Sequence, residues 1–88
     1  MNNISLLRKK LLYRSSHRGC KETDIILGAF ALKFINSFSF SELIRYEKIV
    51  DLDDDILYFY INHYASLPTH LDRGMIRAII HFVVENIH

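Results

Sequence analysis

Hydrophobic residues recur along almost the whole chain with the three- and four-residue spacing of an α-helix. Breaks in this pattern are few, because the chain has one proline, Pro68, and three scattered glycines. The pattern predicts five helices, which cover residues 3–13, 21–32, 40–50 and 56–63 and a last segment that ends near residue 87. Short connections between amphipathic helices favour a small, all-α five-helix bundle.

The third and fifth helices carry start signals, and the second carries a burial signal. Ser39 and Glu42 have the spacing of a capping box, and Thr69 and Asp72 can cap the last helix in the same way. The second helix is apolar on nearly all sides over residues 25–32. Such a helix belongs at the centre of a bundle.

Length and composition indicate a single globular domain that covers residues 1–88. Half of the residues are hydrophobic, which is too many for a disordered chain. The single cysteine, Cys20, cannot form an internal disulfide, and this fits a reducing compartment. No apolar run approaches the roughly 18 residues that a membrane-spanning helix needs, so we expect no membrane contact.

Charge is distributed unevenly along the chain. Residues 1–22 carry six basic side chains and one acid, whereas residues 23–88 carry five basic and nine acidic ones. The two parts therefore have net charges of +5 and −4, and the whole chain has +1. This asymmetry is compatible with a polar docking face, a nucleic-acid patch or a targeting segment. The alternative function is thus a small helical nucleic-acid-binding protein that uses its basic first helix.

Signatures of catalysis are missing from the sequence. There is no glycine-rich phosphate loop, and the five histidines lack metal-type spacing to cysteine or carboxylates. His81 is expected to be partly buried, and the acids of 53–55 are interpreted as a solvated helix start rather than a metal site. A thiol enzyme built on Cys20 would need a group that orients the thiol and an oxyanion site. We therefore expect no catalytic residue, no metal and no enzyme activity.

The segment between the first two helices is the most informative part of the chain. Gly19 lets the backbone turn and presents no side chain to a partner. Arg18 and Glu22 are predicted to present opposite charges on either side of this bare backbone. By themselves these residues describe a tight turn with an exposed ion pair, worth about 0–1 kcal/mol.

The residues around this turn are Tyr13-Arg14-Ser15, followed by Arg18-Gly19-x-x-Glu22-x-Asp24. This pattern resembles the signature of the succinate dehydrogenase flavinylation factors, which are small assembly factors that promote covalent FAD attachment to the flavoprotein subunit. The resemblance extends through the acidic stretch at 53–55 to the Asn62-His63 region. Family members usually carry an Asp-Pro-Asp/Glu-Leu segment and then a tryptophan, where this chain has Asp53-Asp54-Asp55-Ile56 and Tyr58-Phe59-Tyr60. No role is carried over for the missing proline and tryptophan.

The resemblance implies a function in binding. The chain would hold the flavoprotein subunit of succinate dehydrogenase, with fumarate reductase as a further candidate client, and would supply no catalytic group. It would bind no cofactor stably and would meet FAD only through the client. A monomer is expected when the chain is free, with no nucleic-acid partner. The implied partner-binding residues are Arg14, Arg18, Gly19, Glu22 and Asp24.

The position of the motif also gives an expectation about location. Residues 1–21 contain no acid and carry serine and arginine, as mitochondrial presequences do. The motif begins by Tyr13, however, and a helix must precede it, so no cleavable segment is expected. This favours a bacterial cytoplasmic protein, with the mitochondrial matrix as the second choice.

Overall fold

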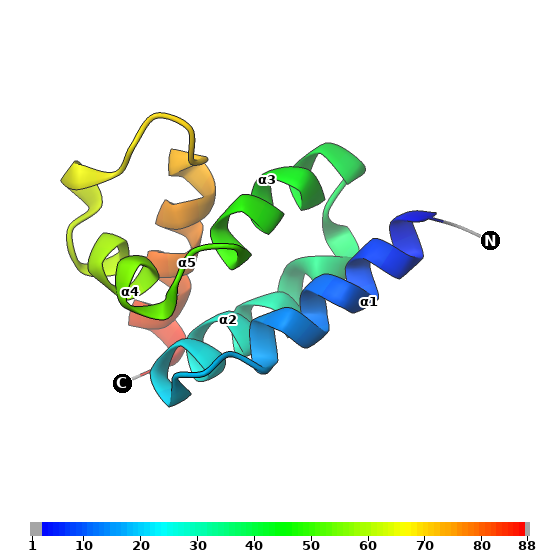
Figure 1. Ribbon diagram of the computed structural model, residues 1–88, viewed down its shortest axis with the longest axis horizontal. Coiled ribbons are helices and arrows are strands. Elements are labelled where there is room, and N and C mark those ends of the chain that lie inside the picture. The colour runs from blue at the N-terminus through cyan, green and yellow to red at the C-terminus, as the bar shows by residue number, and fades with distance from the viewer. Residues whose placement is uncertain (1–2, 88) are drawn as a thin grey trace.

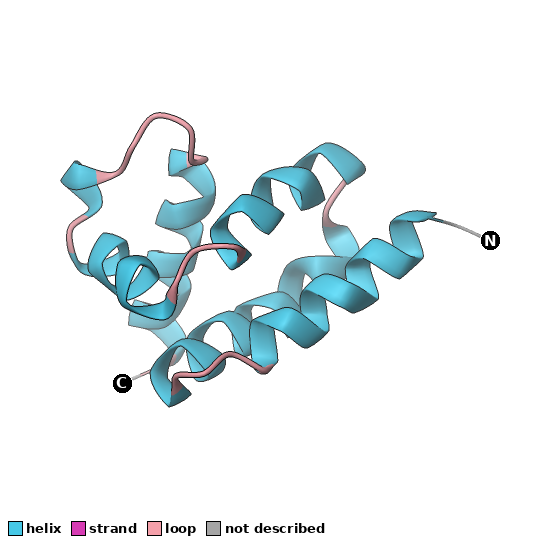
Figure 2. Cartoon of the chain, viewed as in Figure 1, coloured by secondary structure: helices cyan, strands magenta, loops and turns pink. Residues whose placement is uncertain are grey.

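The computed structural model describes residues 3–87. The α-helices in this range are α1 (Asn3–Ser16), α2 (Lys21–Phe34), α3 (Phe40–Val50), α4 (Asp54–Asn62) and α5 (Arg73–Asn86). Two short 3₁₀ turns, Ile35–Ser37 and Tyr64–Ser66, follow α2 and α4, and the described range contains no strand (Figure 2). The predicted all-α five-helix bundle is confirmed.

The arrangement of the helices brings the α1–α2 turn next to the start of α4. α1 and α2 lie side by side as an antiparallel pair, and α3 packs against α1 (Figure 1). α4 and α5 both contact α2 and each other. The turn, the start of α4 and the end of α5 therefore gather at one end of the molecule.

The core is centred on α2, as its apolar surface predicts. Phe30 of α2 is 1% exposed, and its ring contacts four other aromatic rings, those of Phe34, Phe38, Tyr46 and Phe82. These rings belong to α2, α3, α5 and the segment that precedes α3. One aromatic cluster thus ties three helices together.

Helix starts agree with the sequence signals in one case and differ in another. The Ser39 hydroxyl accepts a hydrogen bond from the Glu42 amide (3.2 Å), and the Glu42 carboxylate accepts one from the Ser39 amide (2.8 Å), so the capping box is confirmed. At α5, Asp72 caps alone by accepting from the Met75 amide (3.1 Å). The predicted pairing with Thr69 is wrong, because α5 begins only after Asp72.

Three helices are longer than the pattern predicts, and one of them, α2, continues to Phe34 rather than to residue 32. α1 continues to Ser16, and the Ser15 and Ser16 hydroxyls donate to carbonyls four residues earlier, at 2.7 and 2.8 Å. Ser15 is also fully buried and hydrogen-bonded to the Tyr46 hydroxyl (2.6 Å). α4 begins at Asp54 rather than at residue 56.

The solvent-facing side of α5 holds another difference. His81 is exposed and lies 2.9 Å from the Glu85 carboxylate one turn later, so its predicted partial burial is wrong. The inward positions of α5 are filled instead by Met75, Ile76, Ile79 and Phe82. Within the described range, no helix is long and apolar enough to cross a membrane.

Candidate functional site

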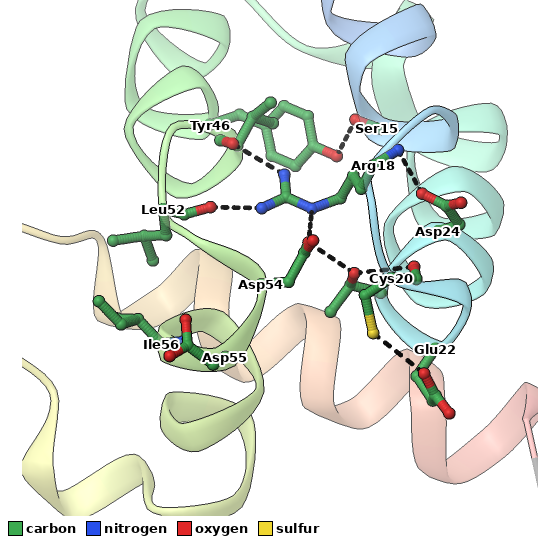
Figure 3. A network of polar contacts seen from close by, with 12 residues as sticks. Ser15, Arg18, Cys20, Glu22, Asp24, Tyr46, Leu52, Asp54, Asp55 and Ile56 are labelled. Carbon is green, nitrogen blue, oxygen red and sulfur yellow. Dashed lines mark hydrogen bonds and ion pairs between the residues drawn. The ribbon is translucent and has the colours of Figure 1, made fainter.

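Arg18 clamps the α1–α2 turn to the segment that links α3 and α4 (Figure 3). Its side chain is only 8% exposed. Its Nε donates to the Asp54 carboxylate (2.6 Å), and its two terminal nitrogens donate to the carbonyls of Val50 (2.7 Å) and Leu52. All three acceptors lie between the end of α3 and the start of α4, and we call this set of bonds the Arg18 clamp.

Asp54 is the charged partner of the clamp. Besides Arg18, it accepts a hydrogen bond from the hydroxyl of Thr23 (2.7 Å), which is fully buried at the start of α2. Burial raises the pKa of Asp54, but the hydrogen bonds from Thr23 and Arg18, with the Arg18 charge, outweigh burial and hold the pKa below its usual 3.8. Asp54 is therefore a carboxylate at neutral pH, in the first turn of α4, where the helix dipole favours an acid.

Asp24 shapes the same turn from the α2 side. Its carboxylate accepts a hydrogen bond from the Arg18 backbone amide, and its own amide donates to the Cys20 carbonyl (3.0 Å). Arg18 is thus held through its main chain by α2 and through its side chain by the α3–α4 segment. The turn is bonded on both sides.

Gly19, Cys20 and Glu22 form the outward surface of the turn, which we call the motif face. Gly19 is exposed and its φ is not positive, so the local backbone conformation does not require glycine. A Cβ at this position would lie 3.7 Å from the Asp54 carboxylate, an ordinary van der Waals distance. What glycine provides here is bare backbone that a partner can approach.

Glu22 supplies the negative charge of the motif face. Its side chain is exposed, and the Cys20 thiol donates to its carboxylate (3.0 Å). This hydrogen bond is the main reason that the pKa of Glu22 lies below its usual 4.5. Glu22 therefore presents a full negative charge at neutral pH.

The structure divides the predicted site residues into two groups. Arg18 and Asp24 are bonded within the turn, whereas Gly19 and Glu22 face outward. Arg14 lies one turn before the end of α1 and pairs with Asp51 and, at 3.6 Å, with Glu47 of α3.

The predicted exposed pair between Arg18 and Glu22 is wrong. Arg18 turns instead toward the α3–α4 segment, where one carboxylate and two carbonyls converge on its planar guanidinium group. Glu22 alone could not satisfy so many donors. The acids of 53–55 do mark the start of α4, with Asp53 at the N-cap and Asp54 and Asp55 in the first turn, but Asp54 is paired with Arg18 and is not solvated as expected.

Sequence reasoning missed the residues of α4 that border the motif face. Asp55 and Tyr58, with Asp54, line a hollow of about 410 Å³ whose other wall is Cys20 and Glu22. Tyr58 is 48% exposed. The only sequence signal was an acidic run followed by aromatics, which is too general to assign. The described residues contain no group of three or more His, Cys, Asp or Glu side chains that could hold a metal ion.

Comparison with known proteins identifies the type of molecule to which this surface belongs. Residues 9–83 match the sequence model of a family described as "Flavinator of succinate dehydrogenase". Proteins named "Succinate dehydrogenase assembly factor 2, mitochondrial" are similar to the chain in Dictyostelium discoideum (32% identical, covering 92% of this chain and 57% of the relative) and Debaryomyces hansenii (37%, covering 75% and 47%). The protein of that name in Saccharomyces cerevisiae is 36% identical, covering 69% and 38%. No solved structure matches the chain.

These relatives correct one expectation. They come from eukaryotes and are named mitochondrial, which contradicts the expected bacterial cytoplasmic location and points to mitochondria. The chain spans about half the length of the curated relatives that it matches.

Proposed function

The chain belongs to the family of flavinators of succinate dehydrogenase, and from this premise we propose that it binds the flavoprotein subunit of that enzyme and promotes covalent attachment of FAD to it. The names of the relatives support a mitochondrial setting for this activity. Fumarate reductase, whose flavoprotein subunit would offer similar chemistry, is a second candidate client. The free chain acts as a monomer in this proposal.

The observation that carries the proposal is the rigid presentation of the motif face. The Arg18 clamp and the Asp24 bond fix the turn before any partner arrives. A surface that is ordered in advance loses little conformational entropy on binding. Gly19 then offers close approach, and Glu22 offers a charged contact, at a fixed position relative to α4.

The contribution of the chain is binding rather than chemistry. The bond between flavin and client forms within the client, and this chain favours the client conformation in which it forms. A protein that binds one conformation of its partner more tightly shifts the population toward that conformation. Exposed backbone and a carboxylate are sufficient for such selective binding.

FAD is met through the client and is not held by this chain. In the hollow beside the motif face the Asp54 charge is paired with Arg18, which leaves the exposed carboxylates of Glu22 and Asp55. These groups would repel the diphosphate of FAD, since like charges at close range disfavour each other. The acidic wall therefore suits a protein partner better than the free cofactor.

Two cations that the nucleic-acid alternative would use are engaged in contacts within the chain. Arg8 donates to the Phe38 carbonyl (2.8 Å), and Arg14 pairs with Asp51 and Glu47. These side chains bond neighbouring segments and so do not form a free basic stripe, although Arg14 remains 40% exposed. The comparisons give the alternative no support.

Co-expression of the chain with a succinate dehydrogenase flavoprotein subunit tests the proposal. We expect covalent flavin, seen as fluorescence of the client on a denaturing gel, to rise well above the level that the client reaches alone. The chain purified by itself should be colourless. Equal fluorescence with and without the chain would contradict the proposed function, and a stoichiometric flavin on the purified chain would contradict the binding-only role.

A further inference from the structure

Two adjoining hollows form one groove between α2, α4 and α5. The first, of about 410 Å³, is lined by Cys20, Glu22, Asp54, Asp55 and Tyr58. The second, of about 260 Å³, also includes Glu22 and Tyr58, and its apolar lining is Ile25, Ile26, Ile61, Val83 and Ile87. Because Glu22 and Tyr58 line both hollows, the two hollows lie next to each other at these residues. We call the whole feature the α2–α4 groove.

Both hollows are lined mainly by carbon atoms, and the end toward the motif face differs from the other by the two exposed carboxylates at its margin. The end toward α5 is apolar, and Ile25 and Tyr58 remain 48% exposed there. The end toward the motif face carries the exposed carboxylates of Glu22 and Asp55. Asp54 also lies at this end, but its charge is paired with Arg18.

The negative charge of the groove is not balanced from within. Among the described residues, no lysine or arginine lines either hollow. Lys21 precedes Glu22 in the chain and adds to the lowering of the Glu22 pKa, but it lines neither hollow. A partner that covers Glu22 and Asp55 must supply cations or hydrogen-bond donors, because a carboxylate removed from water without a compensating charge or donor is strongly disfavoured.

We propose that the α2–α4 groove receives a segment of the flavoprotein client that presents a bulky apolar side chain next to an arginine or lysine. This inference rests on the proposed function and adds the chemistry of the contact. The apolar side chain fills the end lined by Ile25, and the cation reaches Glu22 and Asp55. Charge complementarity favours this occupant, since an acidic segment would be repelled by the carboxylates and a cation bonds a carboxylate more strongly than a neutral donor does.

Affinity for the purified flavoprotein subunit, measured over a series of salt concentrations, tests the two ends separately. Ile25→Ser should weaken binding about ten-fold at every salt concentration, because the loss of apolar burial is little affected by screening. The double variant Glu22→Gln/Asp55→Asn should weaken binding about ten-fold at low salt, and the difference from wild type should shrink at high salt.

Matched controls come from exposed residues outside the groove. Leu32→Ser alters a 73% exposed apolar residue near the far end of α2, and Glu85→Gln alters an exposed acid of α5. Both should bind like wild type. Circular dichroism of all variants should match wild type, since the changed side chains lie at the surface.

Several outcomes would overturn the inference. One is unchanged affinity of Ile25→Ser with an unchanged salt dependence of the double variant, and another is tighter binding after the carboxylates are neutralised. A dimer of the free chain that Ile25→Ser dissociates would assign the groove to a second copy. If wild type fails to bind the flavoprotein at any salt concentration, the proposed function fails as well.

Discussion

Gly19→Arg should abolish docking on the flavoprotein subunit, and with it the covalent flavin, while the fold survives. The position has no positive φ, and a Cβ meets only ordinary contact with Asp54, so a side chain can be accommodated. The long arginine side chain would then stand on the motif face, where the partner backbone must approach. Co-expression with the client should give covalent flavin at the level of the client alone.

Three control variants test whether the loss of flavinylation is specific to a bulky side chain at position 19. Gly19→Ala adds only the Cβ and should retain most of the activity. Leu32→Arg places the same bulk and charge on an exposed position of α2 and should be neutral. Lys9→Ala removes an exposed cation of α1 and should also leave flavinylation unchanged. Arg8, another cation of α1, would be a poorer control because it donates a hydrogen bond to the Phe38 carbonyl. A folded Gly19→Arg chain that supports full flavinylation would show that the motif face is not the docking centre.

Arg18→Ala should have the largest effect on stability, with a loss of about 3–5 kcal/mol in the free energy of unfolding. The substitution leaves the Asp54 carboxylate and the carbonyls of Val50 and Leu52 without their donor in a largely buried position. For a domain of this size, such a loss lowers the melting temperature by about 15 °C or more. Arg18→Lys keeps the positive charge but lacks the planar set of donors. Its free energy of unfolding should therefore lie between those of Arg18→Ala and wild type.

Acid titration of the unfolding free energy checks the same contact. The folded-state pKa of Asp54 is depressed, so its contribution is present above the unfolded pKa and is lost as pH falls through the folded pKa. Arg18→Ala should lack much of this acid-sensitive stability. An Arg18→Ala chain that is as stable as wild type but does not bind would identify Arg18 as a contact residue and contradict the clamp.

Local signals in the sequence predicted those features of the fold that depend on residues close together in the chain. The capping box of Ser39 and Glu42 involves residues three apart, so the helix start follows from the sequence alone. The central position of α2 follows in the same way from its apolar surface. The extension of α1 did not follow, because Ser15 is loop-like by composition and becomes helical through burial against Tyr46.

The local sequence pattern could not predict the role of Arg18. Its partner Asp54 is 36 residues away, and the two meet only because α4 folds back beside the α1–α2 turn. The sequence therefore pointed to the correct family but assigned Arg18 to the surface with Glu22. In the structure, Arg18 stabilises the turn through its buried hydrogen bonds, whereas Gly19 and Glu22 lie on the motif face.

The alkylation rate of Cys20 tests the central claim, that the client covers the motif face, most directly. Cys20 is the only cysteine of the chain, is partly exposed and lines the hollow beside Glu22. With the flavoprotein subunit about ten-fold above its dissociation constant, the rate of alkylation by iodoacetamide, followed on this chain by mass spectrometry, should fall to about one tenth. A Cys20→Ser/Leu32→Cys chain should react equally fast with and without the client. An unchanged Cys20 rate in a complex that has demonstrably formed would contradict the account.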